Sequence, residues 1–235
     1  MTPGPVTQCA ILIGGAGSRL GDLTRETPKP MLPIGRAPFL AHLLKKAALS
    51  GLTRIVLLAG FRADVVAHWL AESAIAERLG IQIDLSIEPE PMGTGGALLF
   101  ARDRLDQTFL LVNGDTWFDF DWRSLADADL APIVLGLKRL DLADRYETVE
   151  LDDRRVCRIV ARSGEKKAGL INGGAYRIDK AGLPSGLTSC SLESDILPHA
   201  CRTGGLAGLE FEGAFIDIGL PSSYSAADKL FADDA

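Results

Sequence analysis

A glycine-rich loop directly follows the first apolar run of this chain. Residues 9–13 are apolar, residues 14–17 read Gly-Gly-Ala-Gly, and Ser18 and Arg19 come next. Glycine adopts backbone angles that other residues avoid, and it lets the chain approach a ligand closely. Successive backbone N–H groups in such a loop form a cradle for anions. Because open α/β sheets bind ligands at the carboxyl ends of their strands, the loop predicts a phosphate site at the end of a first strand.

Two cations accompany the loop. Arg19 stands at its end, and Lys29 follows between Pro28 and Pro30. The prolines restrict the backbone on both sides of the lysine, which a merely solubilising surface lysine does not need. An ordinary glycine turn is the simpler interpretation of the glycines alone. Adding Arg19, Lys29 and the prolines favours a polyphosphate site.

Two commoner phosphate loops do not fit this spacing. The dinucleotide fingerprint G-x-G-x-x-G/A needs a small third residue, and Leu20 occupies that place. The P-loop needs a Gly-Lys-Ser/Thr triplet after its spacer residues, and none follows here. A nicotinamide-dependent oxidoreductase is therefore a weaker rival, since the chain also lacks a convincing acid for the ribose.

The combination of residues 14–20 (GGAGSRL) and 28–31 (PKPM) closely resembles the signature of the sugar-1-phosphate nucleotidyltransferases. The family usually has Thr where this chain has Ser18, and both supply a hydroxyl. The resemblance implies a Rossmann-like, three-layer α/β/α fold with a mixed, mostly parallel central sheet. Many relatives carry a C-terminal β-helix, for which this chain ends too early. The resemblance assigns nucleotide binding to Gly14, Gly15, Ala16, Gly17, Ser18 and Arg19, and a catalytic role to Arg19, Lys29 and Asp115.

Hydrophobic patterns divide the chain into two halves of one expected domain, residues 1–235. In the first half, apolar runs alternate with helical patterns, which predicts a parallel sheet with crossover helices. The second half is richer in strand patterns, with a hairpin around Asp152-Asp153. We therefore expect one mixed sheet, with a nucleotide half at about residues 1–125 and a sugar half at about residues 126–235. The expected strands are Gln8–Ile13, Arg54–Leu58, Ile81–Ile87, Thr108–Val112, Ala131–Lys138, Thr148–Leu151, Val156–Ala161, Leu170–Ile178 and Phe211–Ile218, and the expected helices are Phe39–Leu49, Ala63–Leu79, Gly96–Leu105, Leu192–Cys201 and Ser222–Phe231.

Composition narrows the range of partners. A net charge of −6 argues against a general nucleic-acid binder, and no apolar run approaches the length of a membrane span. The N-terminus has no signal-peptide pattern, the four cysteines show no C-x-x-C spacing, and the three histidines are scattered. We expect a cytoplasmic protein with reduced thiols, no membrane partner and no nucleic acid. The sequence leaves a monomer and a homodimer both open.

A second candidate motif is Asn113-Gly114-Asp115, which closes the apolar run that ends at Val112. A turn is its simpler interpretation, because such dipeptides are common in turns. The phosphate loop upstream favours a metal site instead, since Mg²⁺ prefers one or two carboxylates with phosphate oxygens and water. The resemblance assigns Mg²⁺ to Asp115, the nucleotide to Gly114 and the sugar phosphate to Asn113.

A charged residue interrupts the apolar run at 215–219, which reads Phe-Ile-Asp-Ile-Gly. Burying a carboxylate in a strand costs free energy unless the carboxylate is paired or coordinated. Asp217 resembles the family's second Mg²⁺ ligand. Only the fold could bring it to Asp115, so this pairing rests on the resemblance.

The segment at 165–172 is the candidate sugar site. Taken alone, Glu165-Lys166 is a solvated charge run. The family carries Glu-Lys before an Asn-containing strand, so the resemblance assigns sugar hydroxyls to Glu165, the sugar's phosphate to Lys166 and the sugar to Asn172. The family's usual proline is replaced here by Lys167.

The candidate base loop runs from Glu88 to Gly96. Its glycines allow the backbone to lie against a base, and we assign Glu88, Gly93 and Thr94 to the nucleotide. A carboxylate only accepts hydrogen bonds. Guanine offers two adjacent donors, whereas uracil and thymine place acceptors beside their single donor, so Glu88 favours guanine. A charged loop residue without this role is the alternative.

Together these motifs imply a Mg²⁺-dependent nucleotidyl transfer from a nucleoside triphosphate, with GTP favoured, to a sugar 1-phosphate. Residues 88–97, 111–121, 144–153, 169–179 and 215–224 resemble the guanylyltransferases that act on D-glycero-α-D-manno-heptose 1-phosphate for bacterial capsule and surface polysaccharide. One departure is Glu147, where a Gly is expected. Mannose-1-phosphate guanylyltransferases and N-acetylmuramate-1-phosphate uridylyltransferases are alternatives. A non-catalytic, nucleotide-sugar-sensing regulatory subunit would be expected to lose Lys29, Asp115 or Asp217, and all three are present.

Overall fold

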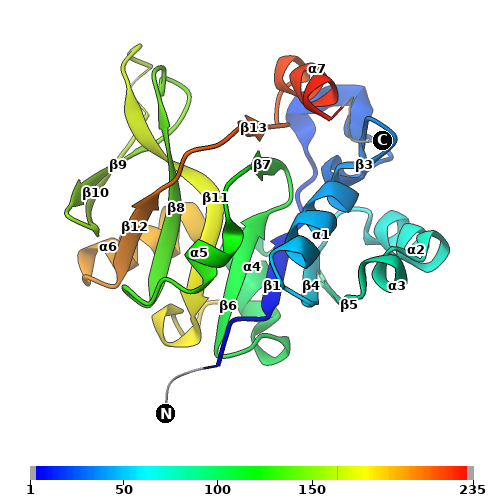
Figure 1. Ribbon diagram of the computed structural model, residues 1–235, viewed down its shortest axis with the longest axis horizontal. Coiled ribbons are helices and arrows are strands. Elements are labelled where there is room, and N and C mark those ends of the chain that lie inside the picture. Colours follow the sequence, from blue (N-terminus) through cyan, green and yellow to red (C-terminus); the bar gives the residue numbers. More distant parts are fainter. Residues whose placement is uncertain (1–3, 163, 232–235) are drawn as a thin grey trace.

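A nine-stranded mixed sheet organises the computed structural model, which describes residues 4–162 and 164–231 (Figure 1). The strand order is β5-β4-β1-β6-β11-β8-β12-β10-β9. These strands are β1 Gln8–Leu12, β4 Arg54–Ala59, β5 Gln82–Ile87, β6 Thr108–Asn113, β8 Ile133–Leu140, β9 Thr148–Asp152, β10 Arg155–Val160, β11 Gly169–Asp179 and β12 Leu206–Glu210. Two short ribbons stand apart from this sheet, β2 Pro33–Ile34 with β3 Ala37–Pro38, and β7 Thr116–Phe118 with β13 Phe215–Asp217.

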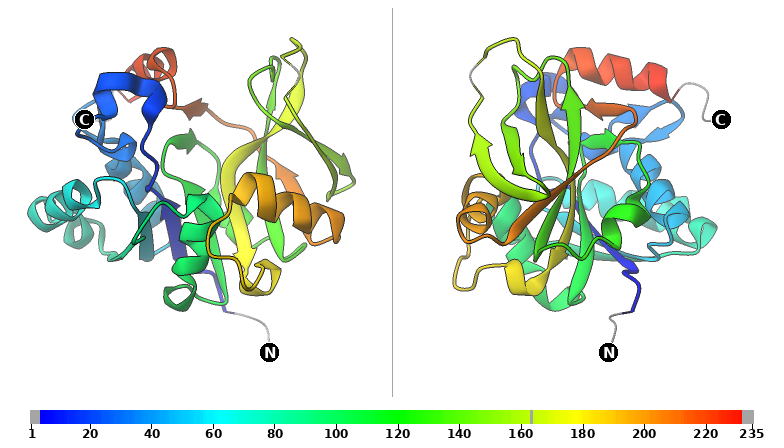
Figure 2. Two further views of the ribbon diagram at one scale, coloured as in Figure 1. Left: turned by 180° about the vertical axis from the view of Figure 1, so that it is seen from behind. Right: turned by 60° about the vertical axis from the view of Figure 1, so that its left-hand side comes forward.

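Helices cover both faces of the sheet. The α-helices are α1 Phe39–Leu49, α2 Ala63–Ser73, α3 Ile75–Leu79, α4 Gly93–Phe100, α5 Trp122–Ala126, α6 Leu197–Arg202 and α7 Pro221–Leu230. Shorter helical turns are Ser18–Thr24, Lys29–Met31, Arg102–Arg104, Lys180–Gly182 and Leu192–Ile196. In the view from behind in Figure 2, α6 (orange) lies in front of the sheet, and α1 lies on the side seen in Figure 1.

Side-chain alternation along β1 builds one core on each face. Cys9 and Ile11 belong to the core that includes Leu40 of α1, whereas Ala10 belongs to the core that includes Leu98 of α4. Successive strand residues point to opposite faces, so a strand covered on both sides must be apolar throughout. This confirms the expected three-layer α/β/α fold.

The two halves of the sheet differ in strand direction. Strands β5, β4, β1 and β6 are parallel neighbours. Antiparallel pairing begins where β11 joins β6, and β8 with β12 is the one parallel pair that follows among the described strands. The mixed sheet is confirmed. Its strands are parallel, as expected, in the first half of the sheet. The expected hairpin is also present, with Arg155 paired to Asp152.

Several expected boundaries were wrong. The helix expected at Ala63–Leu79 is broken at Ala74, whose φ of 49° lies in the left-handed region that interrupts a helix. The helix expected at Gly96–Leu105 runs instead from Gly93 to Phe100. The strand expected at Phe211–Ile218 shortens to β13, because Gly213 (φ 137°) turns the chain against the backbone of Asp119. The short elements β7, β12 and α5 were not expected.

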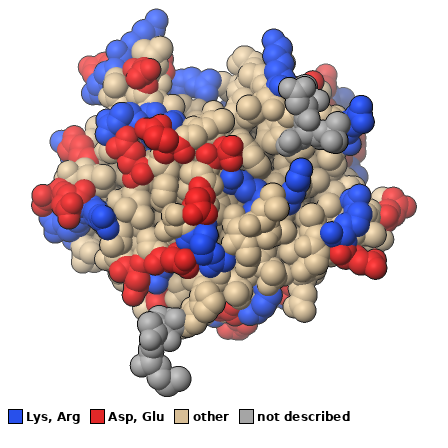
Figure 3. Space-filling model, viewed as in Figure 1, with Lys and Arg blue, Asp and Glu red and all other residues tan. Residues whose placement is uncertain are grey.

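Within residues 4–162 and 164–231, no helix has the length and apolar character needed to cross a bilayer. Acidic and basic side chains are interspersed over the face seen in Figure 3, which shows no continuous basic surface there. Positive charge must therefore be concentrated locally where this acidic chain binds an anion.

Candidate active site

A cleft of about 720 Å³ opens at the carboxyl ends of β1 and β6. Most of the residues assigned to the nucleotide and to catalysis line it. They are Gly14, Gly15, Ala16, Arg19, Lys29, Glu88, Gly93, Thr94 and Asp115. Asn113, assigned to the sugar phosphate, also lines it. Gly17, Ser18 and Gly114 were also assigned to the nucleotide, but the cleft lining does not include them.

The glycine loop is fixed by contacts with the segment after β4 and with the side chain of Lys29. The carbonyl of Gly14 accepts a hydrogen bond from the Phe61 N–H at 3.1 Å, which ties the loop to the end of β4. Gly17 adopts φ 63°, and a Cβ there would lie 3.3 Å from Cε of Lys29. Gly15 faces open space. The loop thus packs on the lysine stem while leaving an exposed backbone surface for a ligand.

Lys29 and Asp115 form an ion pair inside the cleft. The distance from Lys29 Nζ to Asp115 Oδ2 is 2.7 Å, and the two side chains are 16% and 34% exposed. Pro28 has extended backbone angles and Pro30 continues the helical turn 29–31, so the prolines direct the lysine inward. An ammonium group has three donors, and Asp115 uses one. The remaining donors are available to a phosphate.

Gly114 lets β6 end close beside β1. Its N–H donates to the carbonyl of Leu12 at 2.9 Å, and a Cβ at this position would lie 2.4 Å from that same oxygen. Because that oxygen belongs to the backbone, a side chain could enter only by moving the strand end. Gly114 therefore fixes the position of the backbone from which the Asp115 side chain extends.

Gly114→Ala is expected to lower the free energy of unfolding by about 1–3 kcal/mol, because overpacking must displace a strand end. Urea denaturation measures this change. Gly15→Ala is the matched control, since nothing lies within 4 Å of a Cβ there and its stability should match that of the wild type. Equal stability of the two variants would contradict the close-approach role of Gly114.

Pairing between β7 and β13 brings Asp217 beside Asp115. Asp217 stands opposite Thr116, and the N–H of Ile218 donates to the carbonyl of Asp115 at 2.9 Å. Asp217 Oδ1 also accepts the Gly219 N–H at 2.6 Å, which starts the turn into α7. Asp115, in the turn just before β7, and Asp217, on β13, thus lie side by side although they are about a hundred positions apart in the sequence.

The donor set at this ribbon suits Mg²⁺. Across the part of the chain that the structure describes, no group of three or more His, Cys, Asp or Glu residues could hold a metal ion. Asp115 and Asp217 would supply two carboxylates to such an ion and leave the other coordination positions to phosphate oxygens and water. Mg²⁺ prefers that combination to an all-protein cage.

Glu88, the residue expected to meet the base, presents its carboxylate to the cleft. Glu88 Oε2 accepts the Met92 N–H at 3.0 Å. Its other oxygen, Oε1, lies so close to the backbone that a Cβ at Gly60 would come within 2.2 Å of it. Gly60 therefore makes room for the Glu88 carboxylate, and Glu88 lines the cleft where a base could meet it.

Glu193 also lines the cleft, and sequence reasoning missed it. Its Oε2 accepts hydrogen bonds from the hydroxyls of Thr94 at 2.7 Å and Ser191 at 3.0 Å. The same segment covers the first turn of α4, where the carbonyl of Cys190 accepts two backbone N–H groups at 3.0 Å. Glu193 lies in a short polar helical turn, and no local pattern distinguishes it from a solvated residue.

Asn172, which was assigned to the sugar, is not part of the cleft lining and belongs to a hydrogen-bond network at the bend of β11. Its Nδ2 donates to the hydroxyl of Tyr176 at 2.9 Å, and its Oδ1 accepts the Gly174 N–H at 3.1 Å. Burial raises the pKa of Tyr176 far above its ordinary value, so its hydroxyl stays protonated. A Cβ at Gly174 would touch the amide of Asn113, so the ends of β6 and β11 bring the two asparagines into one neighbourhood.

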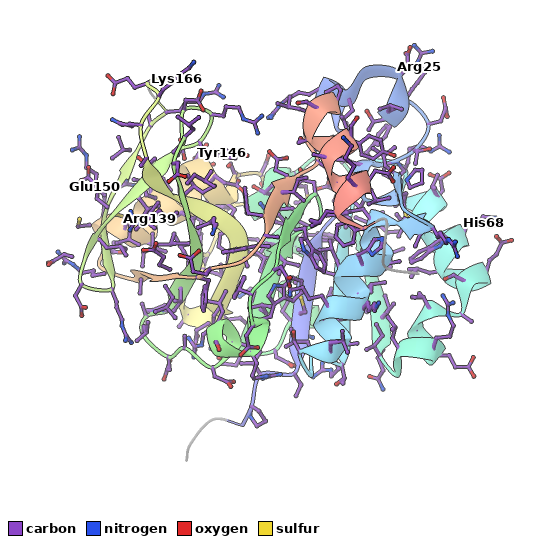
Figure 4. All side chains as sticks on the ribbon, turned by 45° about the horizontal axis from the view of Figure 1, so that its top comes forward. Arg25, His68, Arg139, Tyr146, Glu150 and Lys166 are labelled. Carbon is purple, nitrogen blue, oxygen red and sulfur yellow. The ribbon has the colours of Figure 1, made fainter. Side chains whose placement is uncertain are left out.

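The structure does not bring Glu165 and Lys166 into the cleft lining. Both are exposed on the segment between β10 and β11, and Glu165 Oε2 accepts a hydrogen bond from Lys167 Nζ at 3.1 Å. In Figure 4, Lys166 lies at the outer edge of the molecule, whereas Tyr146 lies further in. Their assignment to the sugar phosphate stays a prediction.

Comparison with known proteins agrees with this arrangement. The family model described as nucleotidyl transferase matches residues 9–233. The D-glycero-alpha-D-manno-heptose 1-phosphate guanylyltransferase of Aneurinibacillus thermoaerophilus is 35% identical over 229 residues, covering 94% of this chain and 97% of that protein. The enzyme of the same name from Campylobacter jejuni is 34% identical, covering 92% and 96%.

A solved structure extends the similarity to three dimensions. HddC from Yersinia pseudotuberculosis, in complex with GMP-PN, superimposes with a TM-score of 0.86 and 31% sequence identity, covering 96% of this chain and all of that one. The sheet, the cleft and the family match lead to one conclusion: this chain belongs to the nucleotidyl transferase family.

Proposed function

We propose that this protein transfers GMP from GTP to a sugar 1-phosphate, D-glycero-α-D-manno-heptose 1-phosphate, releasing pyrophosphate and forming a GDP-sugar for bacterial surface polysaccharide. The observation that carries the proposal is the Lys29–Asp115 ion pair inside the cleft, beside the glycine loop. Two relatives that match nearly the whole chain are named for this reaction, and HddC binds GMP-PN. The four free cysteines suit a reducing compartment, so the proposal takes the reaction to be cytoplasmic.

In the proposed reaction, an oxygen of the sugar phosphate attacks the α-phosphorus of GTP in line, and the bond to the leaving pyrophosphate breaks. The attacking oxygen is already ionised at neutral pH, so positioning and charge neutralisation do most of the work. Arg19 binds the leaving pyrophosphate, and Lys29 neutralises charge near the α-phosphate. Asp115 and Asp217 would hold Mg²⁺, which supplies further charge neutralisation when bound.

In this proposal, Glu88 determines which base the enzyme prefers. Its carboxylate can accept hydrogen bonds from the two adjacent donors of guanine. Glu88→Gln keeps an oxygen for the Met92 N–H but turns one acceptor into a donor. We expect KM for GTP to rise about tenfold or more, because a mismatched polar contact inside a site is costly. KM for UTP should rise less.

Initial-rate kinetics with GTP and UTP measure this preference. Glu90→Gln is the comparison, because Glu90 is an exposed carboxylate of the same loop that also lines the cleft. An unchanged GTP preference in Glu88→Gln, or a change only in Glu90→Gln, would argue against Glu88 as the base-reading residue.

A second candidate is transfer to mannose 1-phosphate. The mannose-1-phosphate guanyltransferase of Aspergillus oryzae is 31% identical to this chain, which spans 63% of its length. Pyrophosphate release, measured with each of the four nucleoside triphosphates against heptose, mannose and N-acetylmuramate 1-phosphates, decides between these substrates. Turnover with GTP and the heptose phosphate is expected, and no turnover across the whole panel would favour a regulatory subunit.

A further inference from the structure

The charged groups of the proposed reaction adjoin two short ribbons that lie apart from the nine-stranded sheet. The helical turn that begins at Lys29 leads directly into the β2–β3 ribbon, whereas Asp115 comes just before β7 and Asp217 lies on β13. The main sheet therefore does not fix these ribbons by its own strand pairing. The 2.7 Å contact between Lys29 and Asp115 depends on how the two ribbons are held relative to each other.

Helix α7 is attached to the β7–β13 ribbon near both of its ends. Before the helix begins, Asp217 Oδ1 accepts the Gly219 N–H at 2.6 Å. Just after the helix ends, the Phe231 ring meets Trp117 of β7 edge-on, with 4.9 Å between ring centroids. Phe231 is buried. The helix thus has a fixed place beside the ribbon that carries Asp217.

The same helix is bonded to the ribbon that follows Lys29. The Tyr224 hydroxyl donates to the carbonyl of Pro33 at 2.6 Å, and Asp228 Oδ1 accepts the Gly35 N–H at 2.8 Å. Tyr224 and Asp228 are four positions apart, so their side chains share one face of α7. Burial raises the pKa of Tyr224, which keeps its hydroxyl a donor at neutral pH. Figures 1 and 2 show α7 (red) beside the blue part of the chain that contains this ribbon.

These two hydrogen bonds matter more for placement than for global stability. A single hydrogen bond contributes only about 0.5–1.5 kcal/mol to stability, whereas a misplacement of about 1 Å in a reacting site can cost about 100-fold in rate. Pro33 is four residues after Lys29, and the Leu32 N–H donates to the carbonyl of Lys29 at 3.1 Å. A shift of the ribbon at Pro33 is therefore passed through this turn to the lysine.

We propose that Tyr224 and Asp228 are positioning residues for Lys29: they bind the ribbon that follows the lysine to a helix anchored at Asp217, and so hold the ammonium group at the reacting phosphate. The inference deepens the proposed function and rests on it. Neither residue lines the cleft, and neither takes a proton or a bond in the reaction. Their loss should therefore lower kcat through Lys29 and leave substrate binding nearly unchanged.

Steady-state kinetics of Tyr224→Phe, Asp228→Ala and the double variant test this role, with pyrophosphate release from GTP and D-glycero-α-D-manno-heptose 1-phosphate as readout. Each single variant is expected to lower kcat about 3- to 10-fold, and the double variant about 10- to 50-fold, because a misplaced catalytic group is costly. KM for both substrates should stay within about twofold of the wild type. Asp228→Asn should restore most of the loss, because asparagine keeps an oxygen for the Gly35 N–H.

Dependence on Lys29 separates positioning from a general structural role. In a Lys29→Met background, Tyr224→Phe and Asp228→Ala should cause no further loss of kcat, because the group that they position is gone. The Mg²⁺ concentration needed for half-maximal rate should stay that of the wild type, since the turn from Asp217 into α7 is unchanged. A general loosening of α7 would instead lower kcat in both backgrounds and raise the Mg²⁺ requirement.

Ser225→Ala is the matched control. Ser225 is an exposed residue of the same helix, and its hydroxyl donates within the helix, to the carbonyl of Pro221 at 3.1 Å. Its loss should leave kcat unchanged. If the wild type turns over and the double variant keeps a normal kcat, or loses as much in the Lys29→Met background, the assignment of Tyr224 and Asp228 is overturned and the proposed function stands. If the wild type releases no pyrophosphate with any substrate pair, both fail.

Discussion

Lys29→Met is expected to lower kcat about 100- to 1,000-fold while the protein stays folded, because a preorganised charge at the reacting phosphate is lost. Methionine keeps most of the stem that packs on Gly17 and removes only the ammonium group. KM for GTP should change less than kcat, since charge grows at the α-phosphate as the reaction proceeds. Pyrophosphate release at saturating substrates measures kcat, and circular dichroism confirms the fold.

Lys46→Met is the matched control for this variant. Lys46 is buried to a similar degree, 13% exposed, and its Nζ also lies 2.7 Å from a carboxylate, that of Asp119. It does not line the cleft. Both variants lose one half-buried ion pair. A fall in kcat caused only by leaving a carboxylate without its lysine would therefore appear in both. A kcat for Lys29→Met within threefold of the wild type, or an equal loss in Lys46→Met, would remove Lys29 from the reaction.

That Arg19, Lys29, Asp115 and the glycine loop meet at one cleft could be predicted from the sequence, because the signals are local. The loop at 14–17 follows an apolar strand directly, and Lys29 stands between two prolines that constrain it. Asp115 follows the end of another apolar strand. In a parallel sheet, the carboxyl ends of such strands share one edge, so their residues meet without any knowledge of longer-range contacts.

The rest depended on tertiary contacts that leave no local pattern. The strand β7 has three residues, too few for alternation to identify, and it exists because β13 pairs with it from about a hundred positions away. Ala74 interrupts a helix although neither glycine nor proline marks the break. Glu193 and Tyr146 owe their places to contacts with Thr94 and Phe215 across the molecule. A charged or aromatic residue in a polar loop carries no sign of such a partner.

Asp217→Asn is expected to lower kcat at least about 100-fold and to raise the Mg²⁺ concentration needed for half-maximal rate about tenfold or more. Asparagine keeps the Oδ1 that accepts the Gly219 N–H, so the turn into α7 should persist. What is lost is one of the two negative charges of Asp115 and Asp217. Titration of Mg²⁺ into the chelator-treated enzyme, with pyrophosphate release as readout, measures both quantities.

Asp179→Asn is the control that isolates charge from turn geometry. Asp179 also ends a strand and accepts the N–H of the residue two positions later, Ala181, at 2.8 Å. Its replacement should leave both the rate and the Mg²⁺ dependence unchanged. If Asp217→Asn lowers kcat while its Mg²⁺ dependence stays that of the wild type, Asp217 is not a metal ligand.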